Sequence, residues 1–196
     1  MSDTIIDNIK SNASACDTMR PIRTLMKEKY KKSDYPSKNV KTETYVEGDV
    51  FVTKLYHDEK DGYVKELSNL KDGVKEVKHF TVKGVLSKLE YFVNDRRHGV
   101  ETKYFIPKAN KSVKSTKTYA DGKLHGECVT YNDNDEVIKQ ELYAEGKLAL
   151  KYARNDSHEI RSVQIVDKDG IAKLPEAERE KLRREMENNP DWFADS

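Results

Sequence analysis

The chain repeats a short sequence pattern, and repetition constrains the fold more than any single residue does. The clearest copy runs from Tyr119 to Tyr131 and reads YADGKLHGECVTY: an aromatic residue, a glycine turn, a His-Gly step and an alternating run that ends in a second aromatic residue. The stretch from Phe92 to Tyr104, FVNDRRHGVETKY, places an aromatic residue, the His-Gly step and the final tyrosine at the same offsets. The chain is therefore expected to consist of small repeated units.

Fainter copies of the pattern lie on both sides of these two. Their first residues are Tyr45, Leu70 and Tyr143, and a degraded last copy lies near Val166. The spacing is roughly 24 residues, which falls in the range of arrays of small supersecondary units. Six units are expected, of which the copies at Phe92 and Tyr119 are the clearest.

Within a unit the hydrophobic period is two residues, which is typical of β-strands. Aspartate or glutamate followed by glycine recurs between the alternating runs and supplies the positive φ that tight hairpin turns require: Asp72-Gly73, Asp121-Gly122, Glu145-Gly146 and Asp169-Gly170. The run Asn132 to Asp135 predicts a second kind of turn between the strands of a unit. Each unit is thus a pair of short strands, and the array is a β-meander of roughly ten to twelve strands.

The pattern Tyr119-x-x-Gly122-Lys123-Leu124-His125-Gly126-Glu127 followed by Tyr131 resembles the MORN repeat, and more closely its bacterial and viral variant, often called antitoxin-like. The resemblance covers about residues 43–170. It departs from the pattern at Leu150, which replaces the glycine of the His-Gly step, and at Asp95, which replaces the turn glycine. The resemblance implies stacked hairpins used for scaffolding, protein contacts or membrane association, and it does not imply catalysis.

Composition limits the kind of protein that these repeats form. Hydrophobic and charged residues each make up 36% of the 196 residues, which favours a thin, extended sheet over a thick two-layered core. The net charge of +1 argues against a general nucleic-acid binder. The sequence shows neither an apolar run near the ~20 residues of a membrane span nor a secretory signal, which predicts a soluble, cytoplasmic protein. Cys16 and Cys128 lack metal or redox spacing and are expected to be reduced.

Three regions are predicted. Residues 1–42 form a basic, helical N-terminal segment, residues 43–170 form the hairpin array, and residues 171–196 form a charged helix, from Pro175 to about Glu187, and an aromatic tail. The fold class is therefore mainly β: an elongated, twisted antiparallel β-meander of stacked hairpins, flanked by short N- and C-terminal helices.

Three groups of residues are candidates for binding or for repeat geometry. The first is aromatic and serves either partner binding or packing between hairpins, or, at the C-terminus, a fold back over the last strand: Tyr104, Tyr119, Tyr131, Tyr143, Tyr152, Trp192 and Phe193. The second is basic and either contacts an anionic surface or forms a solvated helix face: Arg20, Arg23, Lys27, Lys29, Lys31 and Lys32. The third shapes the repeats: Gly99, Gly122, Gly126, Gly146, His98 and His125.

Three functions are compatible with these features. The leading hypothesis is a non-catalytic interaction or scaffold module that binds another protein, in the host cytoplasm or virion if the chain is viral. The alternative is a peripheral module that binds anionic membranes through the basic segment. An enzyme using His57-Asp58, or His98 with His125, as an acid–base element is the weakest hypothesis, because no nucleophile signature, phosphate loop or carboxylate pair is recognisable. We predict no metal, cofactor, small-molecule substrate or nucleic-acid partner, and pairing with a second copy through a sheet edge is an open alternative.

Overall fold

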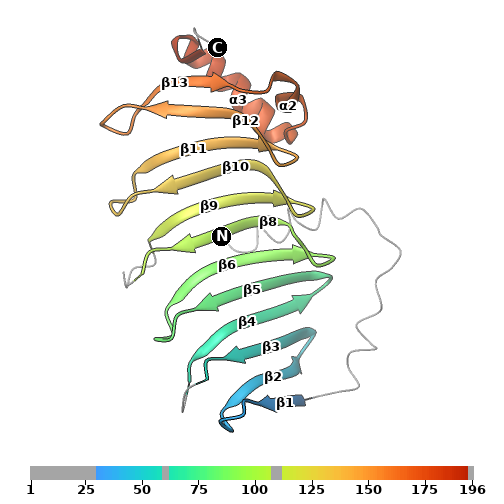
Figure 1. The fold of residues 1–196 in the computed structure, drawn as a ribbon. Helices are drawn as coiled ribbons and strands as arrows, with labels where there is room; N and C mark the ends of the chain where they lie inside the picture. The colour runs from blue at the N-terminus through green and yellow to red at the C-terminus, as the bar shows by residue number, and fades with distance from the viewer. Residues whose placement is uncertain (1–29, 59–61, 107–111, 194–196) are drawn as a thin grey trace. The chain divides into compact units, whose positions relative to one another are not determined.

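The computed structural model describes residues 30–58, 62–106 and 112–193 (Figure 1). These residues form an open antiparallel meander of 13 strands, which confirms the predicted fold class. The strands are β1 (Tyr30–Asp34), β2 (Val40–Glu47), β3 (Val50–Tyr56), β4 (Val64–Lys71), β5 (Val74–Phe80), β6 (Leu86–Val93), β7 (Arg96–Arg97), β8 (Gly99–Tyr104), β9 (Val113–Ala120), β10 (Lys123–Tyr131), β11 (Val137–Ala144), β12 (Lys147–Arg154) and β13 (Ile160–Ile165).

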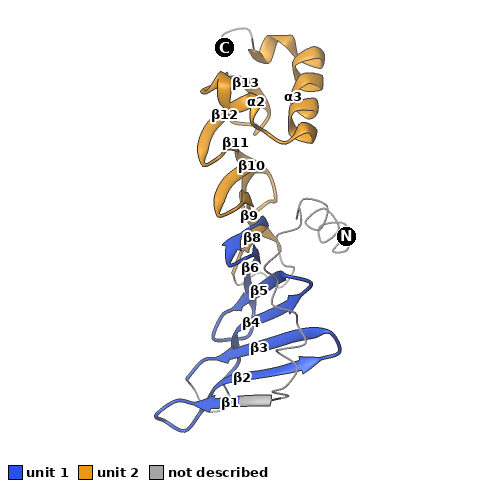
Figure 2. Ribbon diagram, turned by 90° about the vertical axis from the view of Figure 1, so that its right-hand side faces the viewer, with its two compact units in different colours: residues 1–99 blue, residues 100–196 orange. Residues whose placement is uncertain are grey.

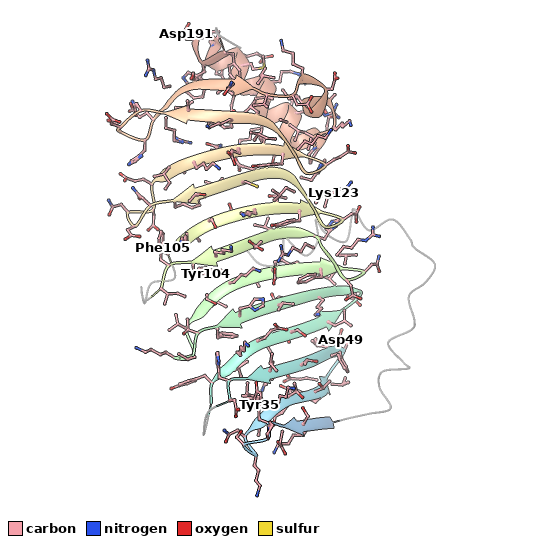
Figure 3. The ribbon with its side chains drawn as sticks, viewed as in Figure 1. Tyr35, Asp49, Tyr104, Phe105, Lys123 and Asp191 are labelled. Atoms are coloured by element: carbon pink, nitrogen blue, oxygen red, sulfur yellow. The ribbon has the colours of Figure 1, made fainter. Side chains whose placement is uncertain are left out.

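The chain consists of two compact units, residues 1–99 and residues 100–196 (Figure 2). In each unit, strands that follow one another in the sequence pair with one another, so the hydrogen-bonded neighbours come from successive segments of the chain. Figure 3 shows the two edges at which the chain turns: in unit 2, Lys123 lies at one edge and Phe105 at the other. We call these the short-turn edge and the long-turn edge.

The short turns contain two residues in the left-handed region. Asp121 and Gly122 have φ values of 49° and 84°, and Glu145 and Gly146 have values of 51° and 90°. Positive φ at both central residues defines the type I′ turn, whose twist matches that of the flanking strands. The hairpin turns predicted at these two places are therefore confirmed.

The turn after β6 adopts the same conformation without glycine. Asn94 and Asp95 have φ values of 50° and 59°, and across them Val93 pairs with Arg96. Asparagine and aspartate enter the left-handed region at lower cost than other residues with a Cβ. The departure from the repeat pattern at Asp95 thus changes the sequence of the turn and leaves its geometry intact.

Five-residue turns in both units share one hydrogen-bond pattern. In the turn 132–136 the backbone N–H of Asn132 donates to the carbonyl oxygen of Glu136 at 2.9 Å, and Asp135, with φ of 63°, donates to the carbonyl oxygen of Asn132 at 3.2 Å. The turns 35–39, 81–85 and 155–159 repeat both bonds, with the left-handed residue again in fourth place. The strand register shifts beside each of these turns.

Three helical elements follow β13: α2 (Lys168–Ala172), α3 (Glu176–Asn188) and the 3-10 helix η2 (Pro190–Phe193). The predicted helix after Pro175 is confirmed. The hairpin turn predicted at Asp169-Gly170 is wrong, because Asp167 caps α2 by accepting the backbone N–H of Gly170 at 3.0 Å. The acid-Gly step Asp169-Gly170, which is compatible with a hairpin turn, lies instead in the first turn of a helix that Asp167 caps.

The helical reading of residues 1–42 fails for the part of that segment that is described. Residues 30–34 and 40–47 form strands β1 and β2, and Tyr30, which lies in the segment predicted to be helical, pairs with Tyr45. The predicted boundary at residue 42 therefore falls inside a strand. The remainder of the predicted N-terminal helix lies outside the described residues.

The largest apolar core lies in unit 2, where the C-terminal helices meet the last strands. Its buried residues come from β11 to β13 and from the chain around α3: Leu142, Ala144, Ala149, Leu150, Tyr152, Val163, Leu174 and Leu182. Ile160, Ile165, Ile171, Trp192 and Phe193 pack around this cluster. Among the described residues, no helix has the length and hydrophobicity of a membrane span.

We expect Asp95→Gly to stabilise the protein. The substitution removes a Cβ from a residue at φ of 59°, which should raise the free energy of unfolding by about 0.5–1 kcal/mol. Urea denaturation followed by circular dichroism measures the change. Asp133→Gly, in a turn position without positive φ, is the control and should not stabilise; an equal gain in both variants would contradict the explanation.

Candidate interaction surface

The strand register separates the two faces of the sheet in unit 2. Gln140 pairs with Tyr152, which pairs with Val163, so these three residues point to one side. Their neighbours in sequence point to the opposite side, because successive residues of a strand alternate. Glu141 therefore lies on the second face, together with its pairing partners Cys128 and Lys151.

Helix α3 covers the first face through the buried Leu182 and through polar contacts. The Lys181 ammonium donates to Glu127 Oε1 at 3.0 Å, and the same oxygen accepts from Gln140 Nε2 at 2.7 Å. The Tyr152 hydroxyl donates to Glu185 Oε2 at 2.7 Å. Burial, followed by this bond to the carboxylate, raises the pKa of Tyr152. Tyr152 thus fastens the helix to the sheet.

Glu178 has the least favourable environment in this interface. Burial raises the pKa of its carboxyl, and the charges of Glu127 and Glu185 add to that effect, while Lys181 opposes it. Its Oε2 atom is buried and accepts no hydrogen bond in the structure. The ammonium of Lys181 is already bonded to Glu127. The docked helix therefore favours the protonated form of Glu178.

The second face carries tyrosines, leucines and lysines, and we call it the Lys–Tyr face. Tyr119 pairs with Leu124 across one type I′ turn, and Tyr143 pairs with Leu148 across the next. All four side chains are half-buried. The face consists of Lys117, Tyr119, Leu124, Cys128, Lys139, Glu141, Tyr143, Leu148 and Lys151.

Glu141 is the one acidic residue of the Lys–Tyr face, and its charge is satisfied within the face. The residue is 8% exposed; Lys139 Nζ lies 2.8 Å from Oε1, and the Tyr143 hydroxyl donates to Oε2 at 3.1 Å. Burial and the Glu141 carboxylate raise the pKa of Tyr143 to about 12. These contacts hold Tyr143 in place as a neutral hydrogen-bond donor.

His125 joins one hairpin to the next. Its Nδ1 accepts the backbone N–H of Glu145 at 3.2 Å, and the adjacent N–H of Gly146 donates to the carbonyl oxygen of Leu124 at 2.7 Å. The start of β10 thus binds the short turn between β11 and β12. This contact supports the structural role predicted for His125.

Gly126 is favoured by its backbone conformation and by the close approach of Thr118. Its φ is 105°, and a Cβ placed on it would lie 3.3 Å from both Cβ and Cγ2 of Thr118. The pairing of β9 with β10 shifts register between Leu124 and Cys128, around this residue. The His-Gly step therefore creates a bulge where the strand leaves its turn.

The predicted aromatic candidates do not form one surface. Tyr119 and Tyr143 lie on the Lys–Tyr face, whereas Tyr152 lies on the opposite face, 4% exposed and bonded to α3, so its assignment to partner binding is wrong. Tyr104 and Tyr131 are half-buried at the ends of β8 and β10. Trp192 and Phe193 pack against the apolar core beside β13, so the tail folds back onto its own sheet.

The predicted anionic-surface residues are largely outside the described part of the chain. Arg20, Arg23, Lys27 and Lys29 all precede residue 30. Lys31 and Lys32 belong to strand β1, where Lys32 Nζ lies 3.6 Å from Asp34. The two residues that can be placed therefore do not form a helical basic face.

Unit 1 contains an ionic cluster that sequence reasoning missed. His79 Nε2 lies 2.8 Å from Glu90 and its Nδ1 lies 3.7 Å from Glu66, while Lys88 and Arg97 approach Glu90 at 2.7 and 3.3 Å. Burial disfavours the charge of Glu90, but Lys88, His79 and Arg97 outweigh burial and lower the pKa of Glu90. The cluster ties β4, β5, β6 and β7 together; only the strand register could have revealed it.

The residues proposed for acid–base chemistry take part in structural contacts. Asp58 accepts a hydrogen bond from Asn39, and the backbone N–H of His57 donates to the carbonyl oxygen of Tyr63. The backbone N–H of His98 donates to the carbonyl oxygen of Tyr91 at 2.9 Å. In the described ranges, no group of three or more His, Cys, Asp or Glu residues is arranged to hold a metal ion.

Comparison with known proteins gives no family. No family model and no curated protein matches the chain. A crystal structure of an S. aureus TarM mutant in complex with Fondaparinux, alpha-GlcNAc-glycerol and UDP aligns over 74% of this chain, with 10% identity and a TM-score of 0.38. A second TarM crystal structure aligns over 72%, with 8% identity and a TM-score of 0.36. The chain spans about a quarter of those two chains, 26% and 25%.

His125→Ala should weaken the contact between successive hairpins. The loss of the acceptor for the Glu145 N–H should lower the free energy of unfolding by about 0.5–1.5 kcal/mol. Chemical denaturation followed by circular dichroism measures the loss. Lys123→Ala, at an exposed position two residues away, is the control; equal losses in the two variants would count against a role for the imidazole.

Glu178→Gln should stabilise unit 2 increasingly as the pH rises. Folding raises the pKa of Glu178 above 4.5, so its stabilising contribution is complete below the pKa of the unfolded state and is lost as the pH rises through the folded-state pKa. Glutamine mimics the protonated form at every pH. The difference from the wild type should therefore grow above pH 4.5, as measured by urea unfolding with Trp192, the only tryptophan, as reporter.

Glu187→Gln, at an exposed position of the same helix, provides the matched control for that experiment. An equal pH-dependent gain in this variant would show that the gain does not come from the interface around Glu178. A constant difference for Glu178→Gln would show that ionisation of Glu178 does not oppose docking of α3.

Proposed function

We propose that the chain is a non-catalytic protein-interaction module that binds its partner through the Lys–Tyr face of unit 2. The observation that carries the proposal is the repeated Tyr–Leu pair, Tyr119 with Leu124 and Tyr143 with Leu148, on the face opposite to the one that α3 covers. Tyrosine presents a large contact area and loses little conformational entropy on binding. Two such pairs at equivalent places in successive repeats provide a preformed binding surface.

The rigidity of this surface supports the same proposal. Tyr143 is held by Glu141, and the turn between Tyr143 and Leu148 is held by Leu124 and His125 of the preceding hairpin. Side chains and turns that are already fixed cost less entropy when a partner binds. The sequence resemblance to MORN-variant repeats is in keeping with a scaffold of this kind. A structural or host-interaction component of a virus or phage is the biological setting that we favour for it.

The module should lose its partner when both tyrosines are replaced. Immobilised wild-type protein, incubated with extract of its native source, should retain one protein in stoichiometric amount. Crosslinks from that protein should map to Lys117, Lys139 or Lys151. Tyr119→Thr combined with Tyr143→Thr keeps residues that favour strands and should abolish retention. Quantitative mass spectrometry of the retained proteins is the measurement.

Tyr63→Thr serves as the control, because Tyr63 is 60% exposed in unit 1 and lies outside the Lys–Tyr face. It should leave retention unchanged. Equal retention by wild type and double variant would contradict the assigned surface. If the protein instead retains no protein but sediments with phosphatidylserine vesicles at low salt, the membrane-binding alternative replaces this one.

A further inference from the structure

The lysines of the Lys–Tyr face lie in a defined row. Lys117 of β9 pairs with Cys128, Cys128 pairs with Glu141, and Glu141 pairs with Lys151 of β12. The row therefore crosses four neighbouring strands with a lysine at each end. Neighbouring strands are ~4.8 Å apart, so the two lysine positions are separated by roughly 14 Å.

The centre of this row offers no free negative charge. Glu141 is buried and is bonded to Lys139 and to the Tyr143 hydroxyl. Cys128 is buried, and burial raises the pKa of its thiol, so the thiol is neutral. The charges that face the solvent are those of the lysines: Lys139 has a side chain that is 55% exposed, Lys151 is exposed and Lys117 is half-buried. The row is therefore electropositive.

The Tyr–Leu pairs form a second row beside the first. Tyr119 follows Lys117 by two residues on β9, and Tyr143 follows Glu141 by two residues on β11. Two residues along a strand correspond to ~7 Å, so the apolar row lies beside the lysine row toward the short-turn edge. A ligand of the whole face must bring negative charge to one row and apolar surface to the other.

From this arrangement we infer that the partner contributes an acidic, extended segment that crosses β9 to β12, with acidic side chains about four residues apart and apolar side chains against the tyrosines. An extended chain advances ~3.4 Å per residue, so four residues match the distance between Lys117 and Lys151. Charge complementarity at such a surface sets partner choice and association rate. The inference rests on the proposed function, whose binding face it uses.

Selection from a phage-displayed library of random dodecapeptides on the immobilised full-length protein tests the inference. Enriched peptides should carry two acidic residues about four positions apart, together with an aromatic or aliphatic residue. Lys117→Glu combined with Lys151→Glu should weaken binding of a synthetic enriched peptide by more than about tenfold. Added salt should weaken binding to the wild type, because it screens exposed charges.

Lys123→Glu combined with Lys147→Glu is the matched control. Both residues are exposed, and they pair with Ala120 and Ala144, which follow Tyr119 and Tyr143 in the sequence and therefore point to the opposite face of the sheet. The control variant thus has the same change of net charge on the face opposite to the Lys–Tyr face. This variant should bind as the wild type does. Equal loss in both double variants, or enrichment of neutral or basic peptides, would overturn the inference.

The proposed function and the acidic partner can fail separately. Neutral peptides that bind the wild type and are lost on replacement of Tyr119 and Tyr143 would overturn the acidic partner and retain the interaction module. Binding that survives replacement of both tyrosines and reversal of both lysines would overturn both.

Discussion

A sheet that is covered by nothing but its own side chains must create its burial within a single layer, and this constraint applies to the described residues of unit 1. In the described part of that unit, no helix or second sheet packs on either face. Val52 and Val77 are nevertheless 4% and 3% exposed. They belong to different cross-strand rows: Val52 pairs with Tyr45 and Asn69, and Val77 pairs with Ser68 and Glu90. Side chains within a single layer therefore bury residues that elsewhere need a second apolar layer.

The same constraint explains why carboxylates that are buried or half-buried on the described sheet are paired with donors. A carboxylate next to a single-layer sheet is partly desolvated and needs donors within its own face. Tyrosine hydroxyls provide them repeatedly, in pairs that lie within one strand, cross strands or join a strand to a helix: Tyr143 with Glu141, Tyr56 with Glu43, Tyr91 with Glu76 and Tyr152 with Glu185. Lysines two residues away on the same strand supply the charge, as Lys88 does for Glu90 and Lys139 for Glu141. High charged content and stable strands are thus compatible.

The sequence allowed the strands and most turns to be predicted, because both depend on local patterns. Alternation and the acid-Gly steps were sufficient for the hairpins at Asp121 and Glu145. Two predictions from the sequence failed. At Asp167 a side chain that caps a helix competes with a hairpin turn. At residues 30–42 a basic stretch that was predicted to be helical forms strands by pairing with its neighbours. The faces could not be predicted, because register shifts decide them: the pairing of β11 with β12 shifts between Leu148 and Leu150, ahead of Tyr152. Tyr152 was misassigned for that reason.

The long-turn edge also explains the uneven spacing of the repeats. The two widest intervals between repeat starts, from 45 to 70 and from 92 to 119, contain the connections 57–63 and 105–112, whereas the other intervals contain five-residue turns. Even in the longer connections the first residue donates its backbone N–H to the last, as His57 does to Tyr63 and Phe105 to Ser112. Chain length therefore varies at the long-turn edge of each unit while each strand keeps its partner. Evolution, or a protein engineer, can insert new segments at that edge without rebuilding the sheet.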